Sequence, residues 1–139
     1  MPQVRPTPVL RGEERLFFDS ARKHELVFQT CADCAVPLWY PRTVCPLCLG
    51  TNLPLTRASG RGAVYSFTTL YRAGHESRQQ DVPYTIALVD LEENVRMIGD
   101  LIDVPPADVH IGMPVEVRFI ETTDSMTLPA FTARHVRGA

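Results

Sequence analysis

The sequence predicts a mainly β fold with a short N-terminal helix and a small metal-binding module. Twelve prolines and eight glycines among 139 residues indicate frequent turns and short elements. Two Cys-x-x-Cys pairs, Cys31–Cys34 and Cys45–Cys48, have ten residues between them and use every cysteine of the chain. After Gly60, strand-like segments alternate with turns. This length, with 45% hydrophobic residues, predicts one globular domain or one domain with a small module.

The two cysteine pairs predict a structural zinc site. Each pair can form a hairpin turn that presents two thiolates to one tetrahedral ion, so we expect one Zn²⁺ held by Cys31, Cys34, Cys45 and Cys48. Disulfide bonds are the alternative, but the N-terminal segment has no apolar stretch to act as a secretory signal. Iron in a rubredoxin-like site is a second alternative, because tetrahedral sulfur sites suit either metal. A site with four protein ligands is closed, so we expect it to stabilise the fold rather than catalyse.

The N-terminal region predicts an arm followed by a helix. Residues 1–11 contain three prolines and no periodic pattern, so we expect an extended or disordered arm. In residues 12–24, acidic side chains suit the first helical turn and apolar side chains recur on one face, from Phe17 to His24. Phe17 and Phe18 give this short helix a large aromatic surface, which either packs on the chain itself or docks a partner.

The remaining sequence predicts short strands. Leu26–Gln29 is expected to form a strand that enters the metal module. Five further strands are expected at Ala63–Tyr71, Tyr84–Leu91, Val95–Ile102, Val115–Ile120 and Leu128–Val136.

Five strands with a long interruption after the third fit a small Greek-key barrel of the OB type, with a β-sandwich as the alternative. We therefore divide the chain into an N-terminal arm and helix (1–29), a rubredoxin-like zinc ribbon (30–56) and a five-stranded OB-fold barrel (57–139).

No catalytic constellation stands out in the sequence. The four histidines, His24, His75, His110 and His135, are scattered over the predicted helix, a loop, a turn and the last strand, and a lone histidine is usually structural or solvated. The sequence has no GxSxG elbow, glycine-rich phosphate loop or HExxH motif. All thiols are assigned to the metal, so none is left as a nucleophile. We predict no catalytic residue in this chain and no activity of the chain alone.

Two segments are candidates for contact with a partner or ligand. Trp39 and Tyr40 lie between the cysteine pairs, where we expect them to cover the metal site; an exposed aromatic contact is the alternative. Arg42 beside them suits an interface or a phosphate. The long polar loop from Arg72 to Val82 is expected to rim the barrel's binding face. Its candidate contact residues are Arg72, His75 and Arg78. Arg72 and Arg78, together with Arg57 and Arg61, would form a modest basic rim for a phosphate or a partner carboxylate. A flexible hairpin loop is the alternative.

The net charge and the hydropathy argue against two kinds of partner, nucleic acids and membranes. The net charge of −2 and the single lysine argue against capture of a nucleic-acid backbone, which usually needs a basic stripe. A single-stranded nucleic-acid-binding ribbon and barrel is therefore the alternative function rather than the preferred one. No segment has the apolar length of a membrane span, so we expect no membrane insertion. Metal-binding thiols fit a reducing, cytoplasmic location.

The order of motifs resembles the zinc-ribbon/OB-fold family catalogued as domain of unknown function 35. The resemblance spans about residues 14–136 and is carried by these residues in order: Phe17-Phe18, Glu25-Leu26, Cys31-x-x-Cys34, Tyr40-Pro41, Cys45-Pro46-x-Cys48, Ser59 to Ser66, Val82-Pro83-Tyr84, Ile111 to Val115, and Phe119. Two departures are small. Phe18 stands where Trp is common, and Ala35 replaces a glycine that often follows the first knuckle, which makes that turn less certain.

The resemblance implies a non-catalytic partner of thiolase-like enzymes that act on acyl-CoA. Family members accompany acetoacetyl-CoA thiolase and hydroxymethylglutaryl-CoA synthase, thiolases of aromatic degradation, and sterol-carrier-type thiolases that act as aldolases in steroid side-chain breakdown. By this analogy the chain is part of an aldolase (lyase) or thiolase (acyltransferase) hetero-oligomer, in which ribbon and helix dock the enzyme and the barrel shapes the CoA or acyl channel. A stand-alone acyl-CoA binder or thioesterase is a third interpretation.

Overall fold

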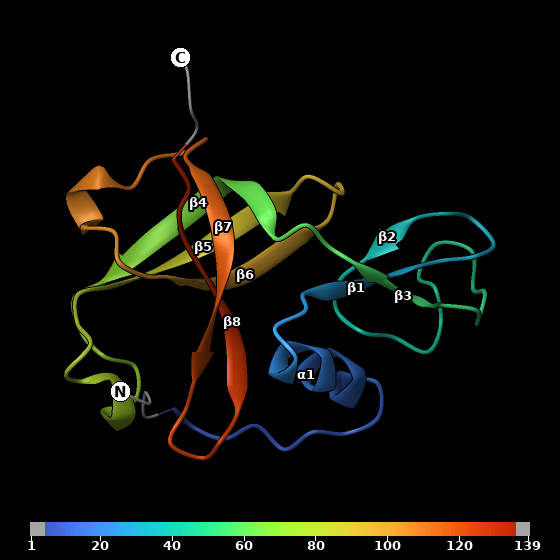
Figure 1. Cartoon of the computed structure of the whole chain (residues 1–139), viewed down its shortest axis with the longest axis horizontal. Coiled ribbons are helices and arrows are strands. Elements are labelled where there is room, and N and C mark those ends of the chain that lie inside the picture. Colours follow the sequence, from blue (N-terminus) through green and yellow to red (C-terminus); the bar gives the residue numbers. More distant parts are fainter. Residues whose placement is uncertain (1–4, 136–139) are drawn as a thin grey trace.

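The computed structural model describes residues 5–135 and divides them into a barrel, a smaller ribbon and one helix (Figure 1). The elements in chain order are α1 Glu14–Arg22, β1 Val27–Thr30, β2 Pro37–Leu38, β3 Leu55–Arg57, β4 Arg61–Leu70, the 3₁₀ turn η1 Glu76–Arg78, β5 Tyr84–Leu91, β6 Arg96–Leu101, the 3₁₀ turn η2 Pro106–Asp108, β7 Pro114–Glu121 and β8 Thr127–Ala133. This architecture confirms the predicted mainly β fold with its ribbon and five-stranded barrel.

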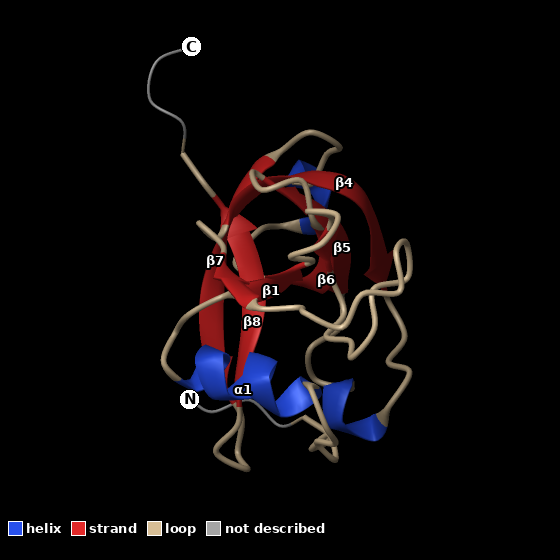
Figure 2. Cartoon of the chain, turned by 90° about the vertical axis from the view of Figure 1, so that its right-hand side faces the viewer, coloured by secondary structure: helices blue, strands red, loops and turns tan. Residues whose placement is uncertain are grey.

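The helix α1 is shorter than the sequence pattern suggested. It starts with the acidic Glu14 and ends at Arg22, and each charge is favourable at its end of the helix dipole. His24 then adopts a left-handed conformation with φ 60°, which stops the helix. The helix buries Phe17 and Ala21, and it lies against β8 of the barrel (Figures 1 and 2).

The ribbon sheet has the strand order β2-β1-β3, with both pairs antiparallel. β2 and β3 are only two and three residues long, which is why periodicity did not predict them. The buried Gln29 side chain fixes the segment after β2, because its amide accepts a bond from the Arg42 N–H at 2.6 Å and donates one to the Arg42 carbonyl at 2.9 Å. The ribbon sheet is thus held by β1 at its centre.

The barrel is closed, with the strand order β4-β5-β6-β8-β7. This closure confirms the OB-type topology and rules out the β-sandwich alternative. β5 runs over the predicted Tyr84–Leu91, and the other four strands differ from the expected ranges by one or two residues at each end whose predicted residue is described. The predicted end of the last strand, Val136, lies outside the described residues.

The clearest contribution to the barrel core is the alternation of buried residues along β5. Every second residue of β5 is buried, and Phe131 of β8 is the largest fully buried side chain in the described part of the chain. β6 and β8 pair in parallel only at Leu101 and Phe131, so the barrel closes through one short contact. Gly99 makes this approach possible, since a Cβ there would lie 3.2 Å from the Phe131 ring.

The described part of the N-terminal arm has no regular secondary structure, but it is attached to the barrel. Arg5 forms ion pairs with Asp81 and Asp100, and the Thr7 hydroxyl is hydrogen-bonded to Asp124 in the β7–β8 turn. The extended arm predicted for residues 1–11 is therefore present from Arg5 onward; residues 1–4 lie outside the described part. Among residues 5–135, no helix has the length and hydropathy to cross a membrane.

Candidate metal centre and contact surfaces

The four cysteine sulfurs come together at one point of the ribbon. All four Sγ atoms lie within 4.8 Å of one another, with Cys31 and Cys48 3.4 Å apart and Cys34 and Cys45 3.7 Å apart. A tetrahedral zinc site with Zn–S bonds of about 2.3 Å places its sulfurs about 3.8 Å apart. A disulfide requires an S–S distance of about 2.05 Å, which excludes the disulfide alternative here. The four cysteines are positioned to bind one metal ion, consistent with a structural zinc.

Each cysteine pair sits on a tight turn that ends in a left-handed residue. The Ala35 N–H donates to the Cys31 carbonyl at 2.8 Å, and the Leu49 N–H donates to the Cys45 carbonyl at 2.9 Å. Ala35 has φ 64° and Leu49 has φ 65°, so the turn persists although neither residue is glycine. The two turns also pack closely, because a Cβ on Gly50 would collide with the Asp33 carboxylate of the other turn.

Hydrogen bonds within the cluster give the thiols different pKa values. The backbone N–H groups of Cys48 and Leu47 lower the pKa of Cys45 to about 7, against the effect of burial. The backbone N–H of Gly50 lowers the pKa of Cys48, but the Cys31 thiol, burial and the other two thiols raise it to about 12. Four clustered thiols cannot all ionise without a cation beside them. A divalent metal therefore suits this site, because it stabilises all four thiolates at once.

The apolar shell of the metal site is not the predicted one. Leu38 is buried with Cys31 and Cys45, and Val36 and Leu53 pack against them. Trp39 instead packs with the large core of helix and barrel residues. The prediction that Trp39 and Tyr40 cover the metal site is therefore wrong for Trp39. Leu38, the last residue of β2, packs on the metal side, and Trp39, which follows the strand, packs on the helix side.

Four of the predicted contact residues form one aromatic cluster. Trp39 lies edge-on to Phe17 at 4.5 Å between ring centroids, Phe17 lies edge-on to Phe18 at 5.2 Å, and Tyr40 stacks on Trp39 at 5.3 Å. Tyr40 is 58% exposed. The Trp39 indole N–H is buried without an acceptor among the described residues, so aromatic packing holds this ring. The helix and the ribbon are joined through these rings.

Two apolar hollows border the aromatic cluster. The first has a volume of about 320 Å³ and lies between the cluster and residues of β6, β7 and β8, with Ile98, Ile120 and Leu128 in its walls. The second, about 300 Å³, lies between the cluster and the arm residues Val9 and Leu10. Sequence reasoning missed both hollows, because each is lined by segments that are separate in the sequence: residues between Arg5 and Pro129 line the first, and residues 8–18 and 39–41 line the second.

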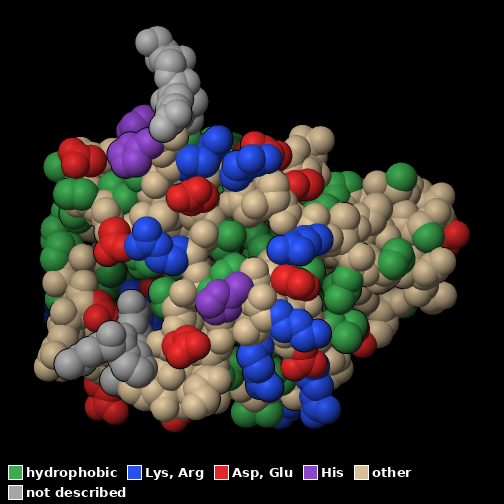
Figure 3. Space-filling view, viewed as in Figure 1, with side chains coloured by type: hydrophobic (Ala, Val, Ile, Leu, Met, Phe, Trp, Pro, Cys, Tyr) green, Lys and Arg blue, Asp and Glu red, His purple; other side chains and the backbone are tan. Residues whose placement is uncertain are grey.

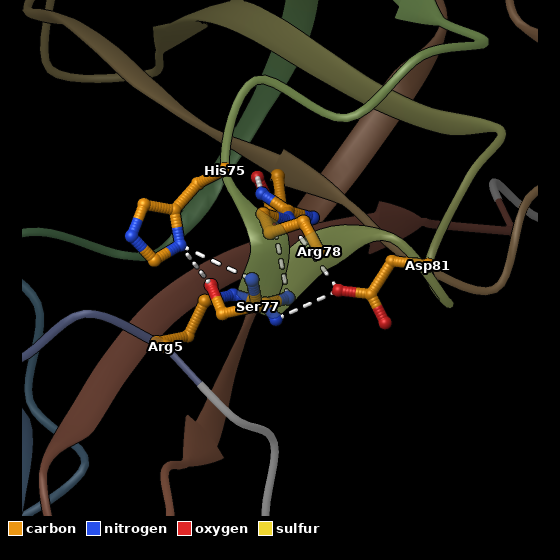
Figure 4. Close-up of polar contacts among 6 residues, drawn as sticks. Arg5, His75, Ser77, Arg78 and Asp81 are labelled. Atoms are coloured by element: carbon orange, nitrogen blue, oxygen red, sulfur yellow. Dashed lines mark hydrogen bonds and ion pairs between the residues drawn. The ribbon is translucent and has the colours of Figure 1, made fainter.

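Arg78 belongs to an ion-pair network rather than to an open basic rim. It pairs with Asp100 at 2.8 Å and Asp81 at 3.3 Å, and its guanidinium lies 3.7 Å above the Tyr84 ring. Arg5 from the arm joins the same carboxylates (Figure 4). Burial opposes the charge of Arg78, but Asp100, Tyr84 and Asp81 leave its pKa raised above the ordinary value. Charges on this network are matched within the protein.

The other predicted contact residues are spread apart. His75 and Arg72 are exposed in the β4–β5 loop, where the His75 ring bonds the Ser77 hydroxyl and N–H and caps the turn η1 (Figure 4). Arg42 is exposed on the ribbon. Within the expected basic rim, Arg57 pairs with Glu25 and Arg61 with Glu92. Three of the four rim arginines therefore have carboxylate partners.

The second cysteine turn exposes an apolar surface that the sequence analysis did not identify. Leu47 is 72% exposed, Leu49 is 74% exposed and Val44 is 43% exposed. In Figure 3 the ribbon end shows mainly hydrophobic and uncharged surface, whereas acidic and basic side chains alternate over the barrel face. We call Val44, Leu47 and Leu49 the ribbon tip. Exposed apolar clusters of this kind mark interaction sites more often than isolated exposed residues do.

Comparison with protein-family models finds two adjacent matches. Residues 18–54 match the model described as ChsH2, rubredoxin-like zinc ribbon domain, and residues 55–119 match ChsH2, C-terminal OB-fold domain.

Among curated proteins, the chain is 33% identical over 128 residues to a probable enoyl-CoA hydratase alpha subunit of Thermomonospora curvata, covering 92% of this chain and 40% of that protein. It is 36% identical over 95 residues to a DUF35 domain-containing scaffold protein of Methanocaldococcus jannaschii, covering 68% of this chain and 67% of that protein. The chain thus spans about two fifths of the hydratase subunit.

Among solved structures, a chain of the Ltp2-ChsH2(DUF35) aldolase is 31% identical and superposes with a TM-score of 0.83. The match covers 91% of this chain and 98% of that one.

Proposed function

The chain belongs to the DUF35 family of paired zinc-ribbon and OB-fold domains, and from this membership we propose that it is a non-catalytic accessory subunit of an acyl-CoA enzyme. The observation that carries the proposal is the similarity to the aldolase chain, which this chain matches over nearly that chain's whole length. The similarity to a hydratase alpha subunit supports the acyl-CoA class. Both relatives belong to enzymes of several parts, which favours a hetero-oligomer.

The chemistry of the chain supports an accessory role. Its most reactive groups are the four thiols, and a four-coordinate metal site leaves no position for water or substrate. The histidines within residues 5–135 lie on four different segments, at the end of α1, in the β4–β5 loop, beside η2 and after β8. We infer that catalytic groups come from the partner enzyme, a thiolase-like or aldolase subunit.

The ribbon tip and the aromatic cluster are the surfaces that we assign to the partner. The metal fixes the turn that carries Leu47 and Leu49, so these side chains are presented without the entropy cost of ordering a loop. Tyr40 offers a further exposed aromatic contact next to the ribbon. The barrel would then lie beside the acyl-CoA channel and shape one wall of it. An aldolase of steroid side-chain breakdown is one candidate partner.

Co-expression with a thiolase-like or aldolase enzyme of the same organism tests the proposal. We expect a co-purifying heteromer whose activity on acyl-CoA exceeds that of the enzyme alone. The double variant Leu47→Asp/Leu49→Asp should lose co-purification while it keeps its zinc, because both side chains are exposed and neither is a ligand. Ile111→Asp, at a 69% exposed position of the barrel, is the matched control and should still co-purify. Separate elution of the wild-type proteins with unchanged activity would show that the proposal is wrong.

A further inference from the structure

One stretch of β4 has a free edge. β4 pairs with β5 from Gly62 to Leu70, but it pairs with β7 only from Arg61 to Ala63. Val64 is bonded to the backbone of Gly112 and Met113, and beyond it the described residues make no backbone hydrogen bond to the second edge of β4. A bulge after Val64 turns the strand away from β7. The edge from Ser66 to Leu70 therefore presents unpaired backbone groups.

This edge lacks the devices that usually prevent pairing between molecules. Natural edge strands are blunted by lysine, proline, inward charges or short length. The segment Val64 to Tyr71 reads Val-Tyr-Ser-Phe-Thr-Thr-Leu-Tyr and contains no charged residue and no proline. Its β-branched and aromatic residues favour extended structure. The edge is suited to receive another strand.

The sequence of the edge favours a second copy of the same strand. In an antiparallel pair centred on Thr68, Ser66 faces Leu70 of the other copy and no like charges meet. The same register brings Tyr65 of one copy opposite Tyr71 of the other, at both ends of the pair. Tyr65 is 48% exposed although Arg96 covers one face of its ring, and Tyr71, the residue after β4, is 70% exposed. Cross-strand aromatic pairs stabilise sheets, and two-fold symmetry supplies this pair twice.

We propose that the chain forms a two-fold symmetric dimer through antiparallel pairing of β4 with β4 of a second copy, centred on Thr68. The dimer joins two barrels into one continuous sheet and leaves the ribbon tip outside the interface. In the proposed complex it would link two accessory subunits, each with its own partner enzyme. A five-residue edge buries less surface than a standard interface, so the dimer is expected to be weak and concentration-dependent.

Sedimentation equilibrium of the zinc-loaded chain tests this pairing. Wild-type protein should be largely dimeric at about 100 μM and largely monomeric at about 1 μM, the range of a micromolar dissociation constant. Thr68→Lys places two lysines face to face on the symmetry axis, and Thr68→Glu does the same with two carboxylates. Each variant should dissociate at least about tenfold more readily, because like charges opposite each other destabilise a strand pair.

Mixing the two variants gives the decisive result. The Thr68→Lys and Thr68→Glu chains together should form a heterodimer at a concentration where each alone is monomeric, since opposite charges then meet. Thr123→Lys, in the exposed β7–β8 turn, is the matched control and should dimerise like the wild type. Unchanged circular dichroism and zinc content exclude misfolding as the cause.

Three outcomes would overturn the proposal: wild-type protein that stays monomeric at about 100 μM, a Thr68→Lys variant that dimerises as readily as the wild type, or a mixture that forms no heterodimer. If the wild type is monomeric and Thr68→Lys loses only its co-purification with the enzyme, the edge takes a strand of the partner instead. Failure of the Leu47→Asp/Leu49→Asp test leaves these measurements unaffected, so the two proposals fail separately.

Discussion

Ala35 shows how one residue carries the strain of a metal-binding turn. It closes the first cysteine turn at φ 64°, a conformation that costs an L-residue roughly 1–2 kcal/mol more than the right-handed one. The related position in the second turn, Leu49, has nearly the same φ. The sequence left the first turn uncertain because Ala35 replaces a glycine. In the structure both turns form, and each keeps its backbone hydrogen bond. The metal and these bonds together hold the strained residues.

We predict that Ala35→Gly stabilises the zinc-loaded protein by about 1 kcal/mol, because glycine adopts a positive φ without the Cβ clash. Urea unfolding of both proteins measures the difference in the free energy of unfolding. Ala107→Gly in η2 is the control, and its extra freedom in the unfolded chain should lower stability by up to about 1 kcal/mol. An Ala35→Gly variant less stable than the wild type would show that the turn is not strained.

At the scale of elements, the ribbon depends on its metal whereas the barrel depends on its core. Of the three ribbon strands, β2 and β3 have two and three residues, and among residues 5–135 the apolar shell of the metal site consists of Leu38, Val36 and Leu53. Such a segment buries too little apolar surface to fold by itself. The barrel strands instead share a continuous core around Phe131 and Val89. Loss of the metal should therefore unfold the ribbon and leave the barrel folded.

We predict one zinc per chain, and chelation should speed amide exchange in residues 31–54 while β4 to β8 stay protected. Hydrogen–deuterium exchange with mass spectrometry measures both regions in one experiment, with Cys34→Ser as a genetic equivalent of chelation. Equal loss of protection in the barrel would contradict the separation.

The affinity for zinc should also decrease as the pH is lowered. Zinc binds thiolates, so protons compete with zinc for the cysteine sulfurs. In the metal-free ribbon Cys45, with a pKa of about 7, ionises first, and Cys48, with a pKa of about 12, holds its proton most tightly. Affinity should therefore decrease steadily from about pH 8 to about pH 5, by at least about a hundredfold. Competition with a chromophoric chelator measures it. A flat profile would show that zinc binding releases no thiol protons and would contradict the prediction.

At the scale of the whole molecule, ion pairs connect segments that lie far apart in the chain. Arg5 of the arm, Arg78 of the β4–β5 loop and Asp100 of β6 meet in one network, in which the arginine side chains are only 10% and 14% exposed. A second site at the surface has the same arrangement as Arg78, an arginine that pairs with an aspartate and lies over a tyrosine ring: Arg96 pairs with Asp90 and lies over Tyr65. The two sites differ mainly in burial, so they form a natural comparison.

We predict that Arg78→Ala lowers the free energy of unfolding by about 2 kcal/mol, because it leaves the poorly exposed Asp100 with fewer partners. Arg96→Ala should lower it by about 0.5 kcal/mol, since its partners are about half exposed and well solvated. Chemical denaturation of both variants at the same pH gives the comparison. Equal losses would show that burial does not decide the strength of these pairs.

The sequence by itself determined the metal ligands and the strands of the barrel. Both depend on short-range spacing: two residues between cysteines, and alternation of apolar residues along a strand such as β5. The helix ends were less well predicted, because the left-handed residue His24 stops the helix and periodicity does not reveal it.

Only the tertiary structure decided which surfaces meet. It placed Trp39 on Phe17 rather than on the metal, joined Arg5 to Asp100 across 95 residues, exposed the ribbon tip and left part of β4 unpaired. These contacts depend on how separate elements pack, and no local pattern encodes that packing. Local spacing can specify a ligand set or a strand, whereas the partner of a side chain depends on the whole fold.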